Sequence, residues 1–130
     1  MILLDTHVVL WLAFAPDKIS NNARTAIADA RKTASSLAIS DITLWELAMF
    51  ASKGRIGLDI SVESLLQEVE SRFVVLPISR QACTRALSLP ATYPRDPADR
   101  IIGATALAEG LSLLTADSEI RRSNAIQTIW

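Results

Sequence analysis

The chain has 130 residues, enough for one domain with a hydrophobic core, and we expect residues 1–130 to form a single domain. Half of the residues are hydrophobic, which excludes a disordered chain. The formal net charge is −1, so the protein has no overall positive field. Any contact with nucleic acid must therefore use a local patch of basic residues.

The sequence predicts neither a membrane span nor a signal peptide. The apolar run at residues 8–15 is much shorter than the roughly 20 apolar residues that a membrane span needs. Asp5 and His7 precede this run and no basic residue does, unlike in a signal peptide. The single cysteine, Cys83, cannot form an internal disulfide. We therefore expect a cytoplasmic protein in which Cys83 is a buried core thiol.

The beginning of the chain predicts one strand and two helices. A short apolar strand at residues 1–4 stops at Asp5 and Thr6, either of which can cap the helix that follows. Residues 8–14 of that helix are too apolar for a helix with one solvated face. Ser20 is expected to begin a second helix.

A second strand is predicted at residues 37–40, ending at Asp41. Thr43 and Glu46 have the spacing of a capping box, so a helix is expected to begin near Thr43 and to end at Gly54. This helix would carry Glu46 in its first turn, just beyond the second strand.

The middle of the chain predicts two helices with a strand between them. The first helix begins at Ser61, the strand covers residues 73–77, and the second helix runs from Ser79 to about Leu89. Residues 90–97 are expected to form an extended connection.

The last part of the chain contains the longest helical pattern. Asp96 can cap this helix, Pro97 suits its first position, and Gly110 is expected to end it. Strands are predicted at residues 111–115 and 125–129, the second at an edge of the sheet. Because strands and helices alternate throughout, the fold class is α/β, with a mainly parallel central sheet and helices on both faces.

Four carboxylates occupy corresponding places in this pattern: Asp5 after the first strand, Glu46 after the second, Asp99 at the start of the long helix, and Asp117 after the fourth strand. Ligands of open parallel sheets bind beyond the carboxyl ends of the strands, so these side chains can converge there if the first strand is central. Carboxylates that lie close together repel one another and need protons or a cation. Their oxygens suit Mg²⁺ or Mn²⁺.

Helix capping is the commoner role of such residues, and it can explain Asp96, Asp117 or Glu46 taken one at a time. Capping does not explain why carboxylates recur at one end of the sheet after three different strands. His7 is expected to make a local polar contact. With one histidine and one cysteine, the chain has no ligand set for zinc.

The motifs resemble those of a known family. In chain order they are Asp5-Thr6-His7, Ser40 through Thr43 to Trp45-Glu46, Asp96-Pro97-Ala98-Asp99-Arg100, and Thr115-Ala116-Asp117. This pattern resembles a PIN domain and, within that family, the VapC-type toxins of toxin–antitoxin pairs. The resemblance covers nearly the whole chain, including residues 53–56. It implies a three-layer α/β/α fold with four to five strands, and a metal-dependent endoribonuclease that a cognate antitoxin neutralises.

The resemblance also implies roles for individual residues. The family's acidic quartet corresponds to Asp5, Glu46, Asp99 and Asp117, as catalytic residues and as ligands of Mg²⁺ or Mn²⁺. Asp5 and Asp99 are the first choice as direct ligands. Asp96 is assigned to capping or an outer position, and whether Thr6 or Thr115 adds a hydroxyl to the site stays open. The candidates for contacts with RNA phosphates are Arg95, Arg100, Lys53 and Arg55.

Two other interpretations stay open. An inactive PIN-like module would bind a protein partner through the apolar helix at residues 8–14 and would show no metal-dependent cleavage. A receiver-like domain with an aspartyl nucleophile would carry a lysine after a later strand, where this chain has Asp117. The antitoxin is expected to cover residues 8–14 with Trp11, and to reach Trp45. The RNA target, the antitoxin's identity and the formation of a homodimer are left open.

Overall fold

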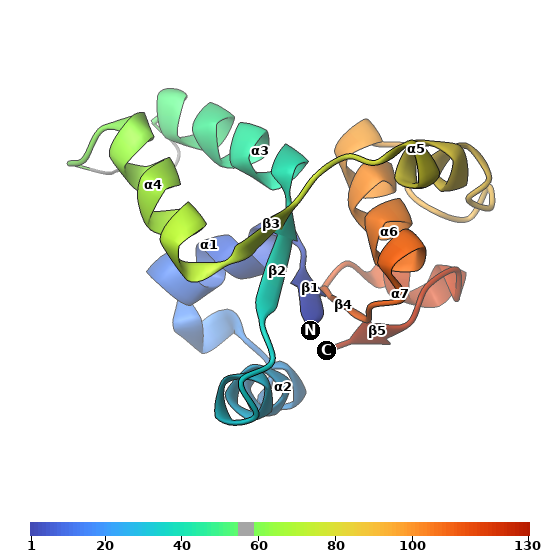
Figure 1. The fold of residues 1–130 in the computed structure, drawn as a ribbon, viewed down its shortest axis with the longest axis horizontal. Helices are drawn as coiled ribbons and strands as arrows, with labels where there is room; N and C mark the ends of the chain where they lie inside the picture. Colours follow the sequence, from blue (N-terminus) through green and yellow to red (C-terminus); the bar gives the residue numbers. More distant parts are fainter. Residues whose placement is uncertain (55–58) are drawn as a thin grey trace.

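The computed structural model describes residues 1–54 and 59–130, so Arg55 and Ile56 of the motif at residues 53–56 lie outside the described residues. Strands and helices alternate along the described chain (Figure 1). The strands are β1 (Ile2–Leu4), β2 (Leu37–Ser40), β3 (Val74–Leu76), β4 (Leu113–Leu114) and β5 (Thr128–Ile129). The helices are α1 (Thr6–Phe14), η1 (Pro16–Lys18), α2 (Asn21–Lys32), α3 (Asp41–Ser52), α4 (Val62–Arg72), α5 (Arg80–Leu87), α6 (Pro97–Glu109) and α7 (Ser118–Ser123).

All the paired strands are parallel, in the order β3-β2-β1-β4-β5, so the first strand is central as the site prediction required. Leu3 of β1 lies opposite Ala38 of β2 on one side and Leu113 of β4 on the other. Because the strands are parallel, their carboxyl ends lie at one edge of the sheet. The segments that follow β1, β2 and β4 therefore meet at this edge.

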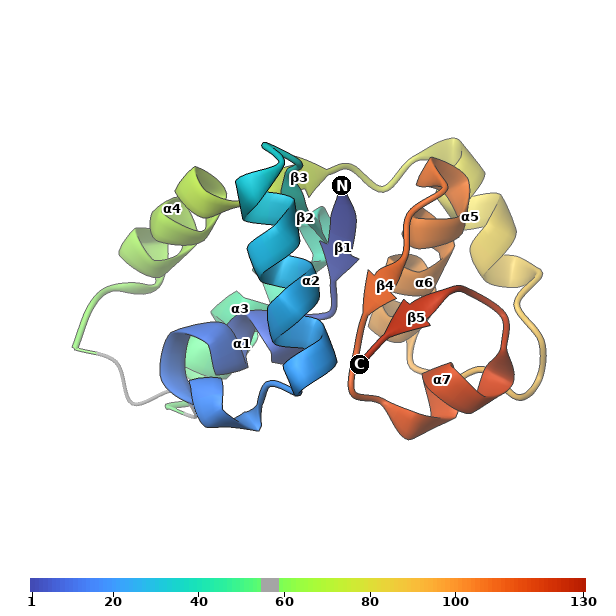
Figure 2. The same cartoon turned by 90° about the horizontal axis from the view of Figure 1, so that it is seen from below.

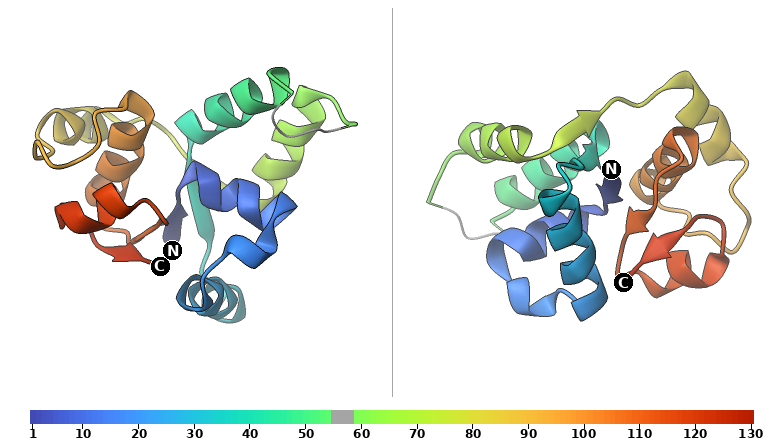
Figure 3. Two further views of the ribbon diagram at one scale, coloured as in Figure 1. Left: turned by 180° about the vertical axis from the view of Figure 1, so that it is seen from behind. Right: turned by 60° about the horizontal axis from the view of Figure 1, so that its bottom comes forward.

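Successive residues of each strand point to opposite faces of the sheet, and each face has its own core. Leu4, Ile39 and Leu114 pack into the core formed with α1, α2, α3 and α4. Leu3 and Leu113 pack instead into the core under α6 and α7. Figure 2 shows α1–α4 on one side of the sheet and α5–α7 on the other, and both views of Figure 3 show the same separation. The predicted three-layer α/β/α fold is confirmed.

A side-chain oxygen of the preceding residue caps the N-terminus of each α-helix in the described chain. The capping residues are Asp5, Ser20, Ser40, Ser61, Ser79, Asp96 and Asp117. The predicted capping box at Thr43 is wrong, because α3 already begins at Asp41 with Ser40 as its cap. Thr43 and Glu46 therefore lie inside α3, and their side chains are free for contacts with other elements.

The expectation that Cys83 is buried is also wrong. Ala82 and Ala86 are the buried residues of α5, and they lie on one face because they are four residues apart. Cys83 is one residue away from Ala82, a rotation of about 100° around the helix, and this turns its thiol to the solvent.

Smaller differences concern the last elements. The strands predicted at residues 111–115 and 125–129 are reduced to the two-residue strands β4 and β5. The six-residue helix α7 was not predicted, because Ile120 is its single buried residue and gives no periodic pattern. None of the helices in the described ranges combines the length and apolar character that a membrane crossing requires.

Leu4 and Leu87 offer a matched test of the core. Leu4→Ala should lower the free energy of unfolding by about 2–5 kcal/mol, because Leu4 is 0% exposed and its truncation leaves a cavity. Leu87 is 89% exposed, so Leu87→Ala should change the free energy by less than about 0.5 kcal/mol. Urea denaturation followed by circular dichroism measures both values. A small effect of Leu4→Ala would contradict its place in the core.

Candidate active site

Asp5 directly follows β1, the central strand, and so lies in the middle of the row formed by the carboxyl ends of the strands. Its backbone N–H donates to the carbonyl of Leu114 at 3.0 Å, which extends the pairing of β1 with β4 by one residue. The side chain is 5% exposed. Its Oδ1 accepts from the N–H of Thr6 at 2.8 Å, and its Oδ2 accepts from the hydroxyl of Thr115 at 2.7 Å. A single orientation of the Asp5 carboxylate is thus held by two donors.

Glu46 reaches the same edge from α3 through two buried hydroxyl groups. The hydroxyl of Thr6 donates to Oε1 of Glu46 at 2.7 Å. The hydroxyl of Thr43 lies 3.0 Å from that of Thr6, and since the Thr6 hydrogen is directed to the carboxylate, Thr43 acts as the donor to Thr6. Thr6 and Thr43 are 1% and 0% exposed, so both hydroxyl groups lie in the interior, and Glu46 is partly exposed.

Asp99 and Asp96 have different tasks at the start of α6. The carboxylate of Asp96 caps the helix by accepting from the N–H of Asp99 at 3.1 Å, as the sequence predicted. The backbone carbonyl of Asp99 accepts from the Tyr93 hydroxyl at 2.9 Å. Because Asp96 serves as the cap, the half-buried carboxylate of Asp99 is left for another role.

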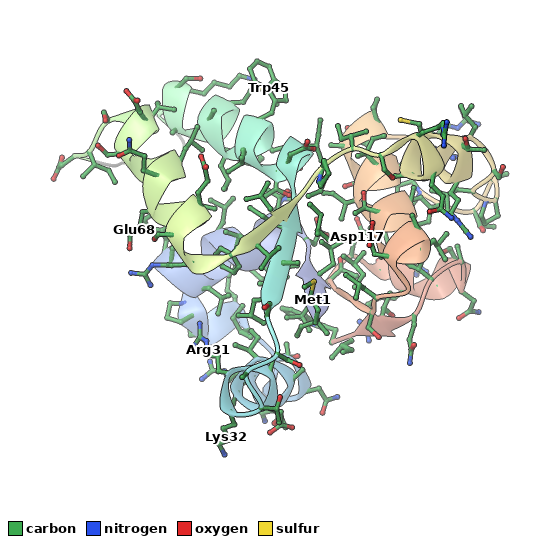
Figure 4. All side chains as sticks on the ribbon, in the orientation of Figure 1. Met1, Arg31, Lys32, Trp45, Glu68 and Asp117 are labelled. Atoms are coloured by element: carbon green, nitrogen blue, oxygen red, sulfur yellow. The ribbon has the colours of Figure 1, made fainter. Side chains whose placement is uncertain are left out.

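Asp117 is linked to Asp5 through Thr115. The N–H of Asp117 donates to the Thr115 hydroxyl oxygen at 3.1 Å, and the same hydroxyl donates to Asp5. One carboxylate oxygen of Asp117, Oδ1, accepts from the N–H groups of Glu119 and Ile120, which caps α7. In the view of Figure 4, Asp117 lies between the central strands and α6.

Burial and the charges of neighbouring acids raise the pKa values of Asp5, Glu46 and Asp99. Burial is the largest cause for each of Asp5, Glu46 and Asp99. For Asp99, burial and then the charges of Asp5, Asp96, Asp117 and Glu46 raise the pKa from 3.8 to about 7. The pKa of Asp5 is raised further by Asp117, and that of Glu46 by Asp5 and Asp96. The acidic residues therefore share one electrostatic environment with too little compensating positive charge.

The donor types at this edge fit a hard divalent cation, since they are carboxylate and hydroxyl oxygens. As the side chains stand, no three acidic, histidine or cysteine side chains in the described residues are close enough to hold a metal ion. Binding of a cation would therefore require the carboxylates to turn toward one another. The raised pKa of Asp99 supports this fit, because a cation can replace the proton that the site otherwise retains.

The basic candidates from the sequence that the structure describes are Arg100, Arg95 and Lys53. Arg100 donates from Nη1 to the carbonyl of Ala86 at 3.1 Å and so joins α6 to α5. Arg95 and Lys53 are exposed, and Arg55 lies outside the described residues. His7 is exposed, and its ring lies between those of Trp11 and Phe50, with both centroids 6.3 Å away. The ring contacts of His7 are therefore with aromatic side chains, where the sequence predicted a local polar contact.

The tryptophans divide between packing and exposure. Trp11 packs against Trp130 with ring centroids 5.7 Å apart, and the ammonium group of Lys18 lies 5.7 Å from a Trp11 ring centroid. Trp45 projects from α3 and is 60% exposed (Figure 4).

Sequence reasoning missed the roles of Thr43 and Tyr93, because nothing local in the sequence shows which distant group a hydroxyl will contact.

The raised pKa of Asp99 predicts a pH dependence of the metal-free fold. Between pH 3.8 and about 7 the folded protein keeps a proton on Asp99 that the unfolded chain loses. The stability contributed by this group is thus full below pH 3.8 and is lost as the pH rises through about 7. In EDTA, the melting temperature should fall between about pH 5 and pH 8, and Asp99→Asn should fall less.

The control for this measurement is Asp29→Asn, which changes an exposed aspartate of α2. It should keep the wild-type pH dependence. Equal slopes for all three proteins would contradict the raised pKa of Asp99.

Asp5, Glu46, Asp99 and Asp117 make the carboxyl ends of β1, β2 and β4 an acidic edge of the sheet, on a fold that is similar to those of known proteins. A profile of the PIN domain matches residues 2–125. Ribonuclease VapC22 of Mycobacterium tuberculosis is 37% identical over 131 residues, which cover 99% of this chain and 98% of the relative.

Solved structures with a similar fold include the DNA-bound VapBC of Salmonella typhimurium, with a TM-score of 0.72, 27% identity and coverage of 98% of this chain and 97% of that one. The VapBC2 complex of Rickettsia felis, bound to a promoter DNA fragment, gives a TM-score of 0.74 at 22% identity, with coverage of 98% and 97%. At that identity the second likeness shows the fold alone. The profile match over nearly the whole chain and the full-length relative lead to one conclusion: this chain belongs to the PIN domain family, as a member of its VapC type.

Proposed function

We propose that this chain is a divalent-metal-dependent endoribonuclease and the toxin of a toxin–antitoxin pair. The observation that carries the proposal is the electrostatic coupling of the buried Asp5 with Asp99, Glu46 and Asp117 at one edge of a PIN fold. The relationship to a protein named as a ribonuclease supports the reaction type, and the VapBC structures support an antitoxin as partner.

Asp5 and Asp99 are the proposed direct ligands of Mg²⁺ or Mn²⁺, with Glu46 and Asp117 binding directly or through water. The cation, when bound, would neutralise the negative charge that develops on the phosphodiester during hydrolysis and would activate a water molecule. Hydrogen bonds from the Thr115 hydroxyl to Asp5 and from the Thr6 hydroxyl to Glu46 restrict the side chains of these two acids. Glu46, whose pKa is raised, is suited to orient the attacking water and to take up its proton.

The rival function is a PIN-like module that binds its partner without cleaving RNA. No member of the acidic quartet is missing from this chain, which favours the enzyme. A receiver-like phosphoryl-transfer domain is not supported, because Asp117 stands after β4 where that class carries a lysine.

Cleavage of RNA tests the proposal directly. Asp99→Asn should lower the cleavage rate by roughly a hundredfold or more, because a neutral amide is a poorer ligand for a hard cation. The rate is measured on structured RNA with Mg²⁺ or Mn²⁺ and again with EDTA, which should abolish it. Asp29→Asn removes an equal charge from the exposed surface of α2 and should cleave like wild type. Cleavage that continues unchanged in EDTA would contradict metal dependence.

An apolar groove marks the proposed docking place of the antitoxin. It has a volume of about 940 Å³ and lies between α1, the end of α2, α4 and β3. Its lining includes the exposed apolar side chains Phe14, Ile60 and Val74 and the charged residues Arg31, Glu68 and Arg72. Figure 4 labels Arg31 and Glu68. An apolar helix or extended segment of the antitoxin, with polar residues toward solvent, fits such a groove.

This location refines the surface predicted from the sequence. The C-terminal half of α1, which belongs to the apolar helix, contributes Leu12, Ala13 and Phe14 to the groove. Trp11 and Trp45 do not line it; Trp11 packs on Trp130 instead.

Phe14→Gln should weaken antitoxin binding by roughly tenfold or more, because Phe14 is 46% exposed and offers a large apolar contact in the groove. Leu87→Gln is the matched control, since Leu87 is also exposed and apolar but lies outside the groove. Isothermal titration calorimetry with the cognate antitoxin measures both affinities. Equal affinities for Phe14→Gln and wild type would place the antitoxin elsewhere.

A further inference from the structure

The hydroxyl of Tyr93 contacts the backbone of Asp99, a proposed metal ligand. Tyr93 itself lies outside the sequence motifs that carry the acidic residues. We propose that Tyr93 is a positioning residue that holds the first turn of α6, and with it Asp99, at the acidic edge of the sheet. This inference rests on the proposed function, because it concerns the placement of Asp99 for cation binding.

The side chain of Tyr93 is anchored from two directions. Tyr93 lies in the connection between α5 and α6, and its N–H donates to the carbonyl of Pro90 at 3.0 Å, which closes a local turn. The side chain is 1% exposed and packs in the core on the α6 side of the sheet, with Leu3, Ile102 and Ile120 among its members. A ring held in this way gives its hydroxyl a fixed position.

The Tyr93 hydroxyl donates to the backbone carbonyl of Asp99 at 2.9 Å. In α-helix geometry this carbonyl also faces the N–H of Gly103, and its two lone pairs can accept both donors. At the other side of the residue, the N–H of Asp99 donates to Asp96. The backbone of Asp99 is therefore held at both its N–H and its carbonyl, and its carboxylate takes no part in either bond.

Gly103 provides the space that the Tyr93 hydroxyl occupies. A β-carbon at position 103 would lie 2.1 Å from Oη and 2.7 Å from Cζ of Tyr93, closer than such atoms approach in proteins. Glycine is a poor helix former, so helix propensity does not explain why residue 103, in the middle of α6, is glycine. The lack of space for a β-carbon beside the Tyr93 phenol explains it.

The phenol remains a hydrogen-bond donor at neutral pH. Burial, and after it the charges of Asp99, Asp5 and Asp117, raise the pKa of Tyr93 above its ordinary value. The hydroxyl thus stays protonated beside a group of carboxylates. A phenylalanine in its place would preserve the packing of the ring and remove only the hydrogen bond.

Tyr93→Phe and Thr105→Val form a matched pair for the test. Thr105 is 2% exposed, and its hydroxyl donates to the carbonyl of Ile101 at 2.7 Å, further along the same helix. Both variants lose one buried hydrogen bond to a carbonyl of α6, so both should lower the melting temperature to a similar extent. Only Tyr93→Phe should weaken Mn²⁺ binding, by roughly tenfold, and lower kcat by a similar factor with little change in KM for RNA.

The experiment uses the whole chain freed of antitoxin, with Mn²⁺ affinity measured by calorimetry and cleavage measured separately. If Tyr93→Phe binds Mn²⁺ as tightly as Thr105→Val, Tyr93 is a core residue only and the inference fails. If the wild-type protein neither binds Mn²⁺ nor cleaves RNA, the proposed function fails and takes this inference with it. A wild type that does both, beside an unchanged Tyr93→Phe, overturns this inference alone.

Gly103→Ala supplies a second, independent variant should Tyr93→Phe not fold. Its β-carbon must displace the phenol from the Asp99 carbonyl, so it should show the same loss of Mn²⁺ affinity. Wild-type Mn²⁺ affinity in Gly103→Ala would overturn the inference.

Discussion

The main physical constraint at the acidic edge is the cost of placing carboxylates that are buried or partly buried beside one another. Asp5, Glu46 and Asp99 all have raised pKa values, with burial as the first cause and neighbouring acids among the others. A fold selected for stability alone would not gather these groups, because their charges oppose its formation. The surrounding hydrogen bonds from Thr6 and Thr115 offset part of this cost and fix the orientation of the acids.

The parallel sheet creates this situation by bringing separate segments to one edge. Asp5 continues the pairing of β1 with β4 through its bond to Leu114, so Thr115 must lie beside it. The direct succession of β2 and α3 then carries Thr43 and Glu46 toward Thr6. Each contact joins residues far apart in the chain, and the alternating order of strands and helices is what makes them neighbours.

Local signals in the sequence were sufficient for the fold and for most helix starts. Ser20, Ser61, Ser79 and Asp96 could be identified as caps because capping depends on residues within one turn. The start of α3 was misplaced because Ser40 and Thr43 are both good caps; in the structure Ser40 accepts from the N–H of Ile42, and the Thr43 hydroxyl contacts Thr6 instead. The bonds of Thr43 and Tyr93 could not be predicted, since both partners lie on other elements.

The hydrogen bonds already present also rank three of the four acids, Asp5, Asp99 and Asp117, as ligands in the proposed site. Oδ1 of Asp117 accepts hydrogen bonds from two N–H groups at the start of α7, which leaves Oδ2 as the oxygen better able to bind a cation. Asp5 accepts one hydrogen bond on each oxygen, so each keeps a lone pair for a cation. Asp99 is relieved of capping by Asp96 and has the carboxylate whose pKa of about 7 most needs a compensating charge. This ranking supports Asp99 and Asp5 as the residues nearest the cation, with Asp117 contributing through one oxygen.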